Sequence, residues 1–228
     1  MTETLQARLA RFAPARIVLL WLALLVLVEA LALLLYLRFA PVIPTAVRYY
    51  VYPFVWINLG LLAVVTTTPP AAPRRRRRIA MALAGGYFLV LAWAGGLLQA
   101  GSALTGQDPL VLFRVVLLDV PPGWGPMVMY DASLVQLFLV PYKVVGYLAL
   151  AYLVYVTVLD AAGSALGGLV GLLSCVSCSW PVLAGLVSGV VGSTSGVATF
   201  VVTQSYDIST VVFVVTVALL YWRPTVGD

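Results

Sequence analysis

The sequence contains no histidine and few charged residues. Histidine is the commonest side-chain ligand of haem iron, copper(II) and zinc and the usual proton shuttle near neutral pH, so its absence argues against a haem site. Charged residues make up 9% of the 228 residues, whereas a soluble domain carries about a quarter. The chain therefore lacks the charged surface that a water-soluble domain requires.

Apolar residues make up 63% of the sequence, and the mean hydropathy is +1.06. A helix needs about 20 apolar residues to cross a bilayer with its backbone polar groups satisfied. We predict one transmembrane domain over residues 1–228, an all-α polytopic helical bundle with six spans at 17–39, 46–66, 79–101, 131–158, 164–192 and 207–222. Residues 182–204 form an apolar run of their own, so seven spans are the alternative.

A run of five arginines sets the expected orientation. It lies in the short loop 67–78, and basic residues in short loops mark the cytoplasmic side. With six spans, both termini are then cytoplasmic and the longer loop 102–130 is external. The run consists of Arg74, Arg75, Arg76, Arg77 and Arg78. We interpret it as a topology signal and an anchor for anionic lipids, not as a nucleic-acid site. We expect a multi-pass protein of the cell membrane.

Polar residues inside the predicted spans are candidates for function. Glu29 and Lys143 each fall near the middle of a span, where a charge is costly unless it is paired or faces a cavity. Gln136 and Lys143 would share one helix face, with Pro141 freeing backbone carbonyls between them. Asn58 lies in the second span. A Glu29–Lys143 pair would be either a proton or substrate relay or a bridge that locks the bundle.

Both cysteines of the chain lie in the stretch GLLSCVSCSWPV, residues 171–182. On an unbroken helix, Cys175 and Cys178 would share one face. Pro181 is incompatible with a normal hydrogen bond to the carbonyl of Ser177, so we expect the helix to break between residues 177 and 181. Broken helices at membrane depth are tolerated inside protein or beside a water-filled cavity, and they commonly mark binding sites.

Three interpretations of the cysteine pair compete. Both residues could be small apolar packing groups. They could also be a dithiol that undergoes disulfide exchange, activated by a nearby cation or a helix N-terminus. The third interpretation is a soft-metal site for Cu(I), to which Met127 and Met129 of the external loop could contribute thioether ligands.

Residues 172–189, LLSCVSCSWPVLAGLVSG, resemble the cysteine segment of membrane electron-transport proteins of the cytochrome c biogenesis and disulfide-reductase type (CcdA, DsbD). Cys178-Ser179-Trp180-Pro181 is similar to the Cys-x-x-Pro of that family, and Ser177 precedes it. The family has two such segments with one redox cysteine each, whereas this chain has a single segment with an extra cysteine. The resemblance implies that Cys178 is the redox cysteine and that Cys175 is its partner within the helix.

These observations predict a membrane protein for thiol-redox or copper handling that supports the maturation of respiratory or secreted proteins. Its partner would be a soluble thiol or copper protein. If it is an enzyme, it is a thiol–disulfide oxidoreductase. The alternatives are a transporter or transport-complex subunit, in which the broken helix binds a substrate, and a purely structural membrane subunit.

Overall fold

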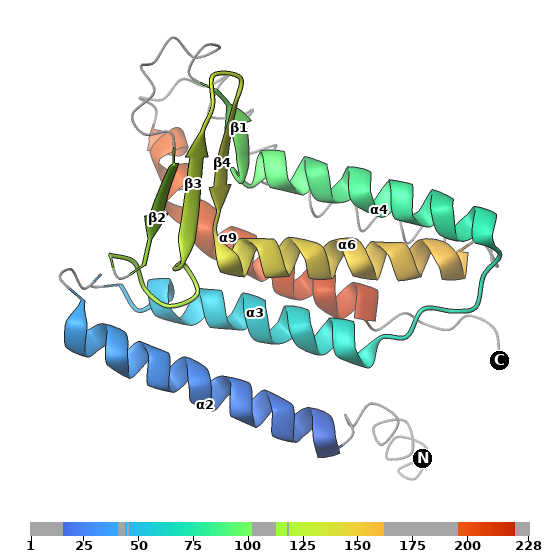
Figure 1. Ribbon diagram of the computed structural model, residues 1–228, viewed down its shortest axis with the longest axis horizontal. Coiled ribbons are helices and arrows are strands. Elements are labelled where there is room, and N and C mark those ends of the chain that lie inside the picture. Colours follow the sequence, from blue (N-terminus) through green and yellow to red (C-terminus); the bar gives the residue numbers. More distant parts are fainter. Residues whose placement is uncertain are drawn as a thin grey trace.

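A computed structural model of the protein describes residues 16–40, 44, 46–101, 113–117, 119–161 and 196–221. These residues form a helical bundle with a small antiparallel sheet at one end (Figure 1). The helices are α2 (Arg16–Phe39), α3 (Arg48–Thr66), α4 (Arg74–Ala94), α6 (Pro141–Ala161) and α9 (Gly196–Tyr221). The strands are β1 (Leu98–Ala100), β2 (Phe113–Val116), β3 (Met127–Asp131) and β4 (Val135–Leu139).

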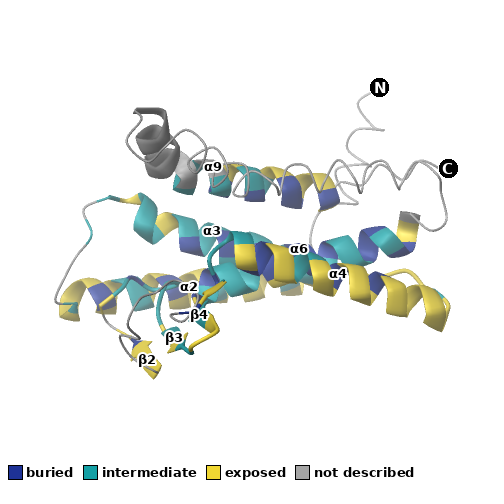
Figure 2. Cartoon of the chain, turned by 90° about the horizontal axis from the view of Figure 1, so that it is seen from above, coloured by how far each residue is buried: buried dark blue, intermediate teal, exposed yellow. Residues whose placement is uncertain are grey.

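Four of the described helices are long and apolar enough to cross a membrane: α2, α3, α4 and α6. The predicted spans 17–39 and 46–66 match α2 and α3 to within two residues. Exposed side chains line α2 and α4, drawn yellow in Figure 2, and on α2 they are mostly leucine and valine. An apolar exposed surface of this kind suits contact with lipid chains.

The side-chain contacts give the direction of each helix. Trp56 of α3 packs against Tyr142 near the start of α6, and Gly60, one turn further along α3, lies against Ala149, about two turns further along α6. Residues of α9 follow the same order along α3, from Asp207 beside Arg48 to Thr210 beside Trp56. Helices α3, α6 and α9 are therefore parallel to one another, and α2 and α4 run in the opposite direction (Figure 1).

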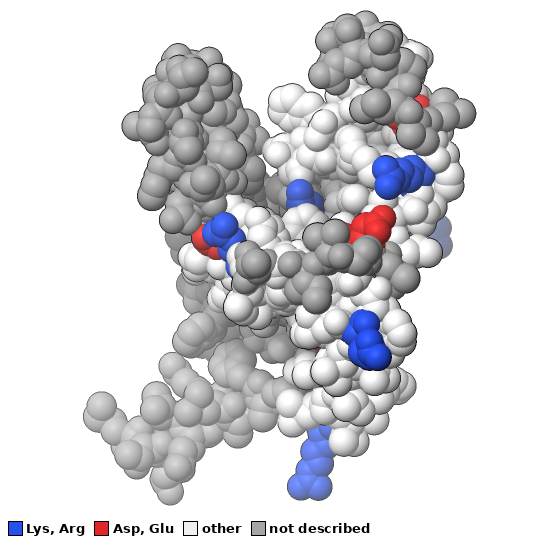
Figure 3. All heavy atoms as spheres, turned by 90° about the vertical axis from the view of Figure 1, so that its left-hand side faces the viewer, with Lys and Arg blue, Asp and Glu red and all other residues white. Residues whose placement is uncertain are grey.

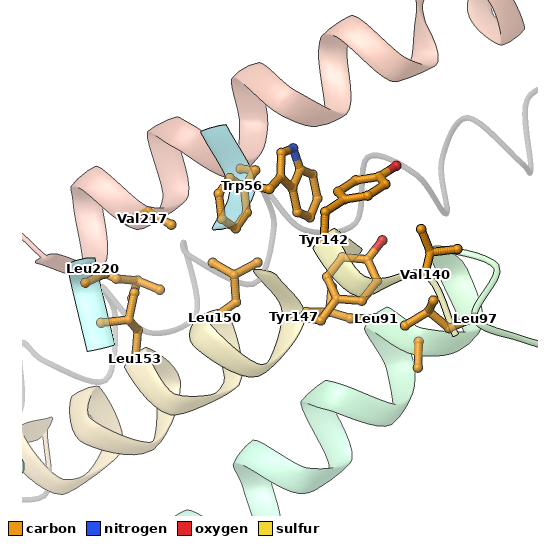
Figure 4. Close-up of a cluster of buried hydrophobic side chains, with 13 residues drawn as sticks. Trp56, Leu91, Leu97, Val140, Tyr142, Tyr147, Leu150, Leu153, Val217 and Leu220 are labelled. Atoms are coloured by element: carbon orange, nitrogen blue, oxygen red, sulfur yellow. The ribbon is translucent and has the colours of Figure 1, made fainter. Parts of the chain in front are cut away.

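The core lies where α3, α4, α6 and α9 meet, around the indole ring of Trp56 (Figure 4). Phe213 of α9 stacks on that ring with 4.1 Å between centroids, and Tyr142 and Tyr147 of α6 contact it edge-on. Gly146 leaves no room for a side chain, because a Cβ atom there would collide with the indole ring. Close helix approach at small residues is the usual packing device of membrane bundles.

Helix α4 ends earlier than the predicted span 79–101, because a pair of glycines terminates it. The amide of Gly96 donates to the carbonyl of Trp93, and the amide of Leu97 donates to that of Ala92. Gly96 has a φ of +76°, which only glycine adopts readily. This is the Schellman arrangement of a helix C-terminus. The chain then continues into β1.

The prediction of an all-α fold is wrong in the region between α4 and α6. Instead of a loop 102–130 followed by a helix from residue 131, the described residues form an antiparallel sheet with strand order β1-β4-β3-β2. Pro141 does not kink a span; it is the first residue of α6, where its missing N–H costs nothing. The stretch PPGWGP, residues 121–126, forms a turn, with the amide of Trp124 donating to the carbonyl of Pro121 at 3.0 Å.

Candidate functional site

The predicted thiol site lies outside the described residues. Cys175, Cys178, Ser177 and Pro181 all fall in residues 162–195, between α6 and α9. Within the described ranges, no group of three or more His, Cys, Asp or Glu residues could hold a metal ion. The polar residues predicted inside the membrane are described, and the structure places each of them.

Glu29, which is buried, and Asn58, which is half-buried, form a polar pair between α2 and α3. The side-chain amide Nδ2 of Asn58 donates to Oε2 of Glu29 at 2.6 Å and to the backbone carbonyl of Phe54 at 2.9 Å. Glu29 is only 9% exposed, although most of α2 is exposed. In the described part of the chain, Oε1 of Glu29 and Oδ1 of Asn58 are buried without a hydrogen-bond partner. Of the polar residues predicted within the spans, the structure thus brings Glu29 and Asn58 together.

Lys143 does not take the position that the sequence suggested. It is the third residue of α6, so it lies at the end of the bundle near the sheet and not at mid-membrane. Its Nζ donates to the carbonyl of Gly95 at 2.8 Å, just beyond α4. A cation at a helix C-terminus is favourable because the last carbonyls carry partial negative charge. The predicted Glu29–Lys143 pair is wrong, because each residue has a different partner.

Gln136 is also displaced from its expected place. It lies on β4, opposite Gln99 of β1 and Asp131 of β3, and not on one helix face with Lys143. The sheet interrupts the predicted span before Pro141, so no continuous helix joins Gln136 to Lys143. The polar patch expected from these residues is therefore absent from the described structure.

Met127 and Met129 both lie on β3, two residues apart, and so point to the same face of the sheet. Met127 is opposite Val116 and packs against the core, and Met129 is opposite Arg114 of β2 and Phe138 of β4. Both side chains are half-buried. The sheet thus keeps the two thioethers at the end of the bundle where α3 and α6 begin (Figure 1).

A charged and aromatic cluster that the sequence analysis did not identify joins α3 to α9 at this end. Nη1 of Arg48 lies 3.1 Å from Oδ2 of Asp207, and the hydroxyl of Tyr52 donates to Oδ1 of Asp207 at 2.6 Å. The rings of Tyr206 and Tyr52 lie 5.2 Å apart. The sequence signal was an acidic residue at the start of one predicted span and an arginine at the start of another.

Aromatic rings connect this cluster to the turn before β3. Trp124 packs against Tyr206 with 5.5 Å between centroids and against Tyr142 with 4.9 Å. Its Nε1 donates to the carbonyl of Tyr49 at 3.0 Å. Tyrosine and tryptophan are common at the membrane–water interface, where one end of the ring system is apolar and the other polar. Figure 3, which looks onto this end, shows scattered charged groups among mostly uncharged atoms.

These features define a class: a helical membrane protein whose bundle carries a small antiparallel sheet at one end and a hydrogen-bonded Glu–Asn pair between two of its helices. A family model matches residues 1–227, almost the whole chain, and the protein belongs to that family, the family of unknown function DUF7546. Searches of curated proteins and of solved structures found no match.

Proposed function

We propose that the protein handles thiols or a soft metal ion in the membrane, in support of the maturation of respiratory or secreted proteins. The observation that carries the proposal is the spacing Cys-x-x-Cys-x-x-Pro at Cys175, Cys178 and Pro181, which contains every cysteine of the chain. Two thiols three residues apart suit either a reversible disulfide or a two-coordinate Cu(I) site. The resemblance to CcdA and DsbD favours the disulfide.

The directions of the helices support a six-span topology. Helices α6 and α9 are parallel, so Ala161 and Gly196 lie at opposite ends of the bundle (Figure 1). We therefore propose that the chain crosses the membrane an odd number of times between α6 and α9. One crossing gives six spans in total, whereas seven spans would make α6 and α9 antiparallel. The continuous helix of α9 through residues 204–207 also disfavours a boundary between two spans there.

This topology supports a position for the cysteines between the two membrane surfaces. Residues 162–195 exceed the roughly 20 residues that one helical crossing requires. Cys175 and Cys178 fall near the middle of that range, and Pro181 follows them. We propose that they lie in the one crossing that joins α6 to α9, at a break where a partner or a metal ion can reach them.

The arginine run supports an orientation with both termini in the cytoplasm. Helices α2 and α4 begin at the same end of the bundle, and Arg74 to Arg78 form the first turns of α4 there. Under the positive-inside rule this end is cytoplasmic. The sheet, with Met127 and Met129, then lies on the external side, where a soluble thiol or copper protein would dock.

The proposed reaction is a balanced exchange between two dithiol–disulfide pairs. The thiolate of Cys178 attacks a disulfide of the partner protein and forms a mixed disulfide, releasing one partner thiolate. The thiolate of Cys175 then attacks Cys178 and releases the second. The partner disulfide is reduced to a dithiol, and Cys175 and Cys178 are oxidised to a disulfide. Two electrons thus pass from the two cysteines to the partner, and the reaction is balanced.

The experiment that tests this proposal counts free thiols in the purified full-length protein. The chain is treated with a maleimide of defined mass before and after reduction, and again after addition of Cu(I). Because the sequence has only two cysteines, the mass of the labelled protein gives the number of free thiols directly. We expect no label after oxidation and two labels after reduction, with C175S and C178S each giving one label in every state. Two labels in every state without Cu(I) binding would reject the proposal.

A second candidate function is a transporter or transport-complex subunit, which the buried Glu29–Asn58 pair favours because such pairs mark ion and proton paths in membrane proteins. The double variant C175S/C178S separates the two candidates in cells. Loss of partner-protein maturation with a stable variant supports thiol handling, and full activity supports transport.

A further inference from the structure

The pair of Glu29 and Asn58 contains two buried polar atoms without partners in the described structure, one on each of the two groups that already touch. Oε2 of Glu29 accepts from Nδ2 of Asn58 at 2.6 Å, while Oε1 of Glu29 and Oδ1 of Asn58 have no partner among the described residues. A buried oxygen without a donor destabilises the folded protein, because it has lost its hydrogen bonds to water and gained none in return. Both unpartnered atoms are oxygens, and an ionised carboxylate has no hydrogen to offer the amide oxygen.

The orientation of the Asn58 amide is fixed by its other contact. Nδ2 lies 2.9 Å from the carbonyl oxygen of Phe54, which can only accept. Nδ2 therefore faces two acceptors, Phe54 O and Glu29 Oε2, and uses one N–H for each. Exchanging the amide oxygen and nitrogen would place oxygen against oxygen at the Phe54 carbonyl. The unpartnered atom of Asn58 is thus its oxygen.

No opposite charge is available beside Glu29 in the described structure. Between Arg16 and Arg38 of α2, Glu29 is the one charged residue, and α3 has no charged residue after Arg48. The tyrosines of these two helices lie towards the sheet end, where Tyr36 packs on Tyr50 and Tyr52 donates to Asp207. Lys143 donates to Gly95. A bare carboxylate in this position would carry an uncompensated charge inside the membrane, which is costly.

We propose that Glu29 is a proton-binding site: its carboxyl group is protonated on Oε1 and donates to Oδ1 of Asn58. One proton then removes the charge and supplies both missing hydrogen bonds. The acid and the amide form a closed pair, with Nδ2–H donating to Oε2 and Oε1–H donating to Oδ1. This neutral pair holds α2, which packs on α3, to the rest of the bundle. The inference stands independently of the thiol proposal.

Labelling suits this test, because Glu3 and Glu29 are the only glutamates in the sequence. The E3Q variant, with carbon-13 at the glutamate carboxyl carbon, therefore reports Glu29 alone in the infrared spectrum. At neutral pH in a lipid bilayer we expect the carbonyl band of a protonated acid, and we expect the E3Q/E29Q variant to lack it. In E3Q/N58L the band should shift, because its carbonyl loses the N–H donor. A carboxylate band alone in E3Q would overturn the proposal.

A bound cation is the competing occupant, and the same sample excludes or identifies it. The spectrum is recorded with sodium, with potassium and with neither ion. We expect the protonated band to be the same in all three. If it appears only when sodium or potassium is removed, the two oxygens hold a cation and the proposal is wrong.

As a second measurement, the melting temperature of E29Q should stay near that of the parent, since glutamine supplies the same donor and acceptor, while that of E29L should fall.

Discussion

Arg48 in the first turn of α3 forms a salt bridge with Asp207 of α9, with 3.1 Å between Nη1 and Oδ2, although 159 residues separate them in the sequence. Tyr52, one turn after Arg48, donates to the second oxygen of the same carboxylate. Together with the contact of Trp56 with Thr210 further along both helices, this junction sets α9 parallel to α3. It therefore underlies the six-span topology that we propose.

Removing the charge of Asp207 should weaken this junction. The carboxylate accepts from both Arg48 and Tyr52, and both ionic partners are about one-third exposed, so solvent screens part of the attraction. We expect D207N to lower the free energy of unfolding by about 1 kcal/mol. The measurement is thermal unfolding in lipid nanodiscs at low and high salt.

The matched control for D207N is R114Q, because Arg114 is exposed on the edge strand β2. It should leave the stability unchanged. If D207N and R114Q unfold alike, or if the effect of D207N does not shrink in high salt, the salt bridge does not hold α9 in place.

Gly146 of α6 should tolerate no side chain. A Cβ atom at this position would collide with the indole ring of Trp56 and come within 3.3 Å of the ring of Phe213, which stacks on that indole. We expect G146A to destabilise the protein by about 1–3 kcal/mol, the usual cost of overpacking. The matched control is G85A in α4, where a Cβ atom meets nothing within 4 Å. That variant should be neutral or gain about 0.5–1 kcal/mol from helix propensity. Equal stability of the two variants would contradict the packing described here.

Trp56 should contribute a hydrogen bond as well as ring contacts. Its Nε1 donates to Oγ1 of Thr210 at 3.2 Å. We expect W56A to lower the free energy of unfolding by about 3–5 kcal/mol, as when other large side chains are removed from a core. T210V keeps the side-chain shape but removes this hydrogen bond and the one that Oγ1 of Thr210 donates to the carbonyl of Tyr206 at 3.1 Å. We expect it to lower the free energy of unfolding by about 1 kcal/mol. In a double-mutant cycle, W56F and T210V should be less than additive, because each removes the same bond. Full additivity would show that the bond contributes nothing.

The arginine run at the start of α4 should make stability depend on anionic lipid. Positive charges at a helix N-terminus are unfavourable in isolation, and each gains about 1 kcal/mol beside an anionic membrane surface. Arg77 also donates to the hydroxyl of Tyr155 at 3.0 Å, so we would leave it in place. We expect the melting temperature of the parent to rise when zwitterionic vesicles are replaced by anionic ones. The rise should be mostly lost in R74Q/R75Q/R76Q/R78Q, and an equal rise in both proteins would exclude the lipid anchor.

The long helices could be predicted from the sequence because their apolar runs are long and uninterrupted. Residues 17–39 and 46–66 gave α2 and α3 to within two residues. The sheet could not be predicted by length and hydropathy alone. Its strands have three to five residues, and short apolar runs such as VQLFL do not distinguish a strand from a piece of a span. Two local signals were present, the Gly95-Gly96 pair and Pro141, and they mark the end of α4 and the start of α6.

Among the candidate residues too, some features could be predicted from the sequence and others could not. Glu29 is buried and has a polar partner, as we expected for one carboxylate in a long apolar helix. Its partner was predicted wrongly, since the position of Lys143 depended on a helix that begins ten residues later than expected. The junction between Arg48 and Asp207 could not be predicted from one sequence, because only the packing of α3 against α9 brings these residues together.

The central claim is that the chain crosses the membrane once between α6 and α9 and that this crossing carries both cysteines. Side-specific labelling tests it most directly. In the background C175S/C178S, single cysteines are introduced by Ala71→Cys before α4, Ser133→Cys between β3 and β4, and Thr225→Cys after α9, and cells are treated with an impermeant maleimide. The account predicts that position 133 is labelled from outside, and that positions 71 and 225 are labelled only after the membrane is opened. Labelling of position 225 from outside together with position 133 would contradict it.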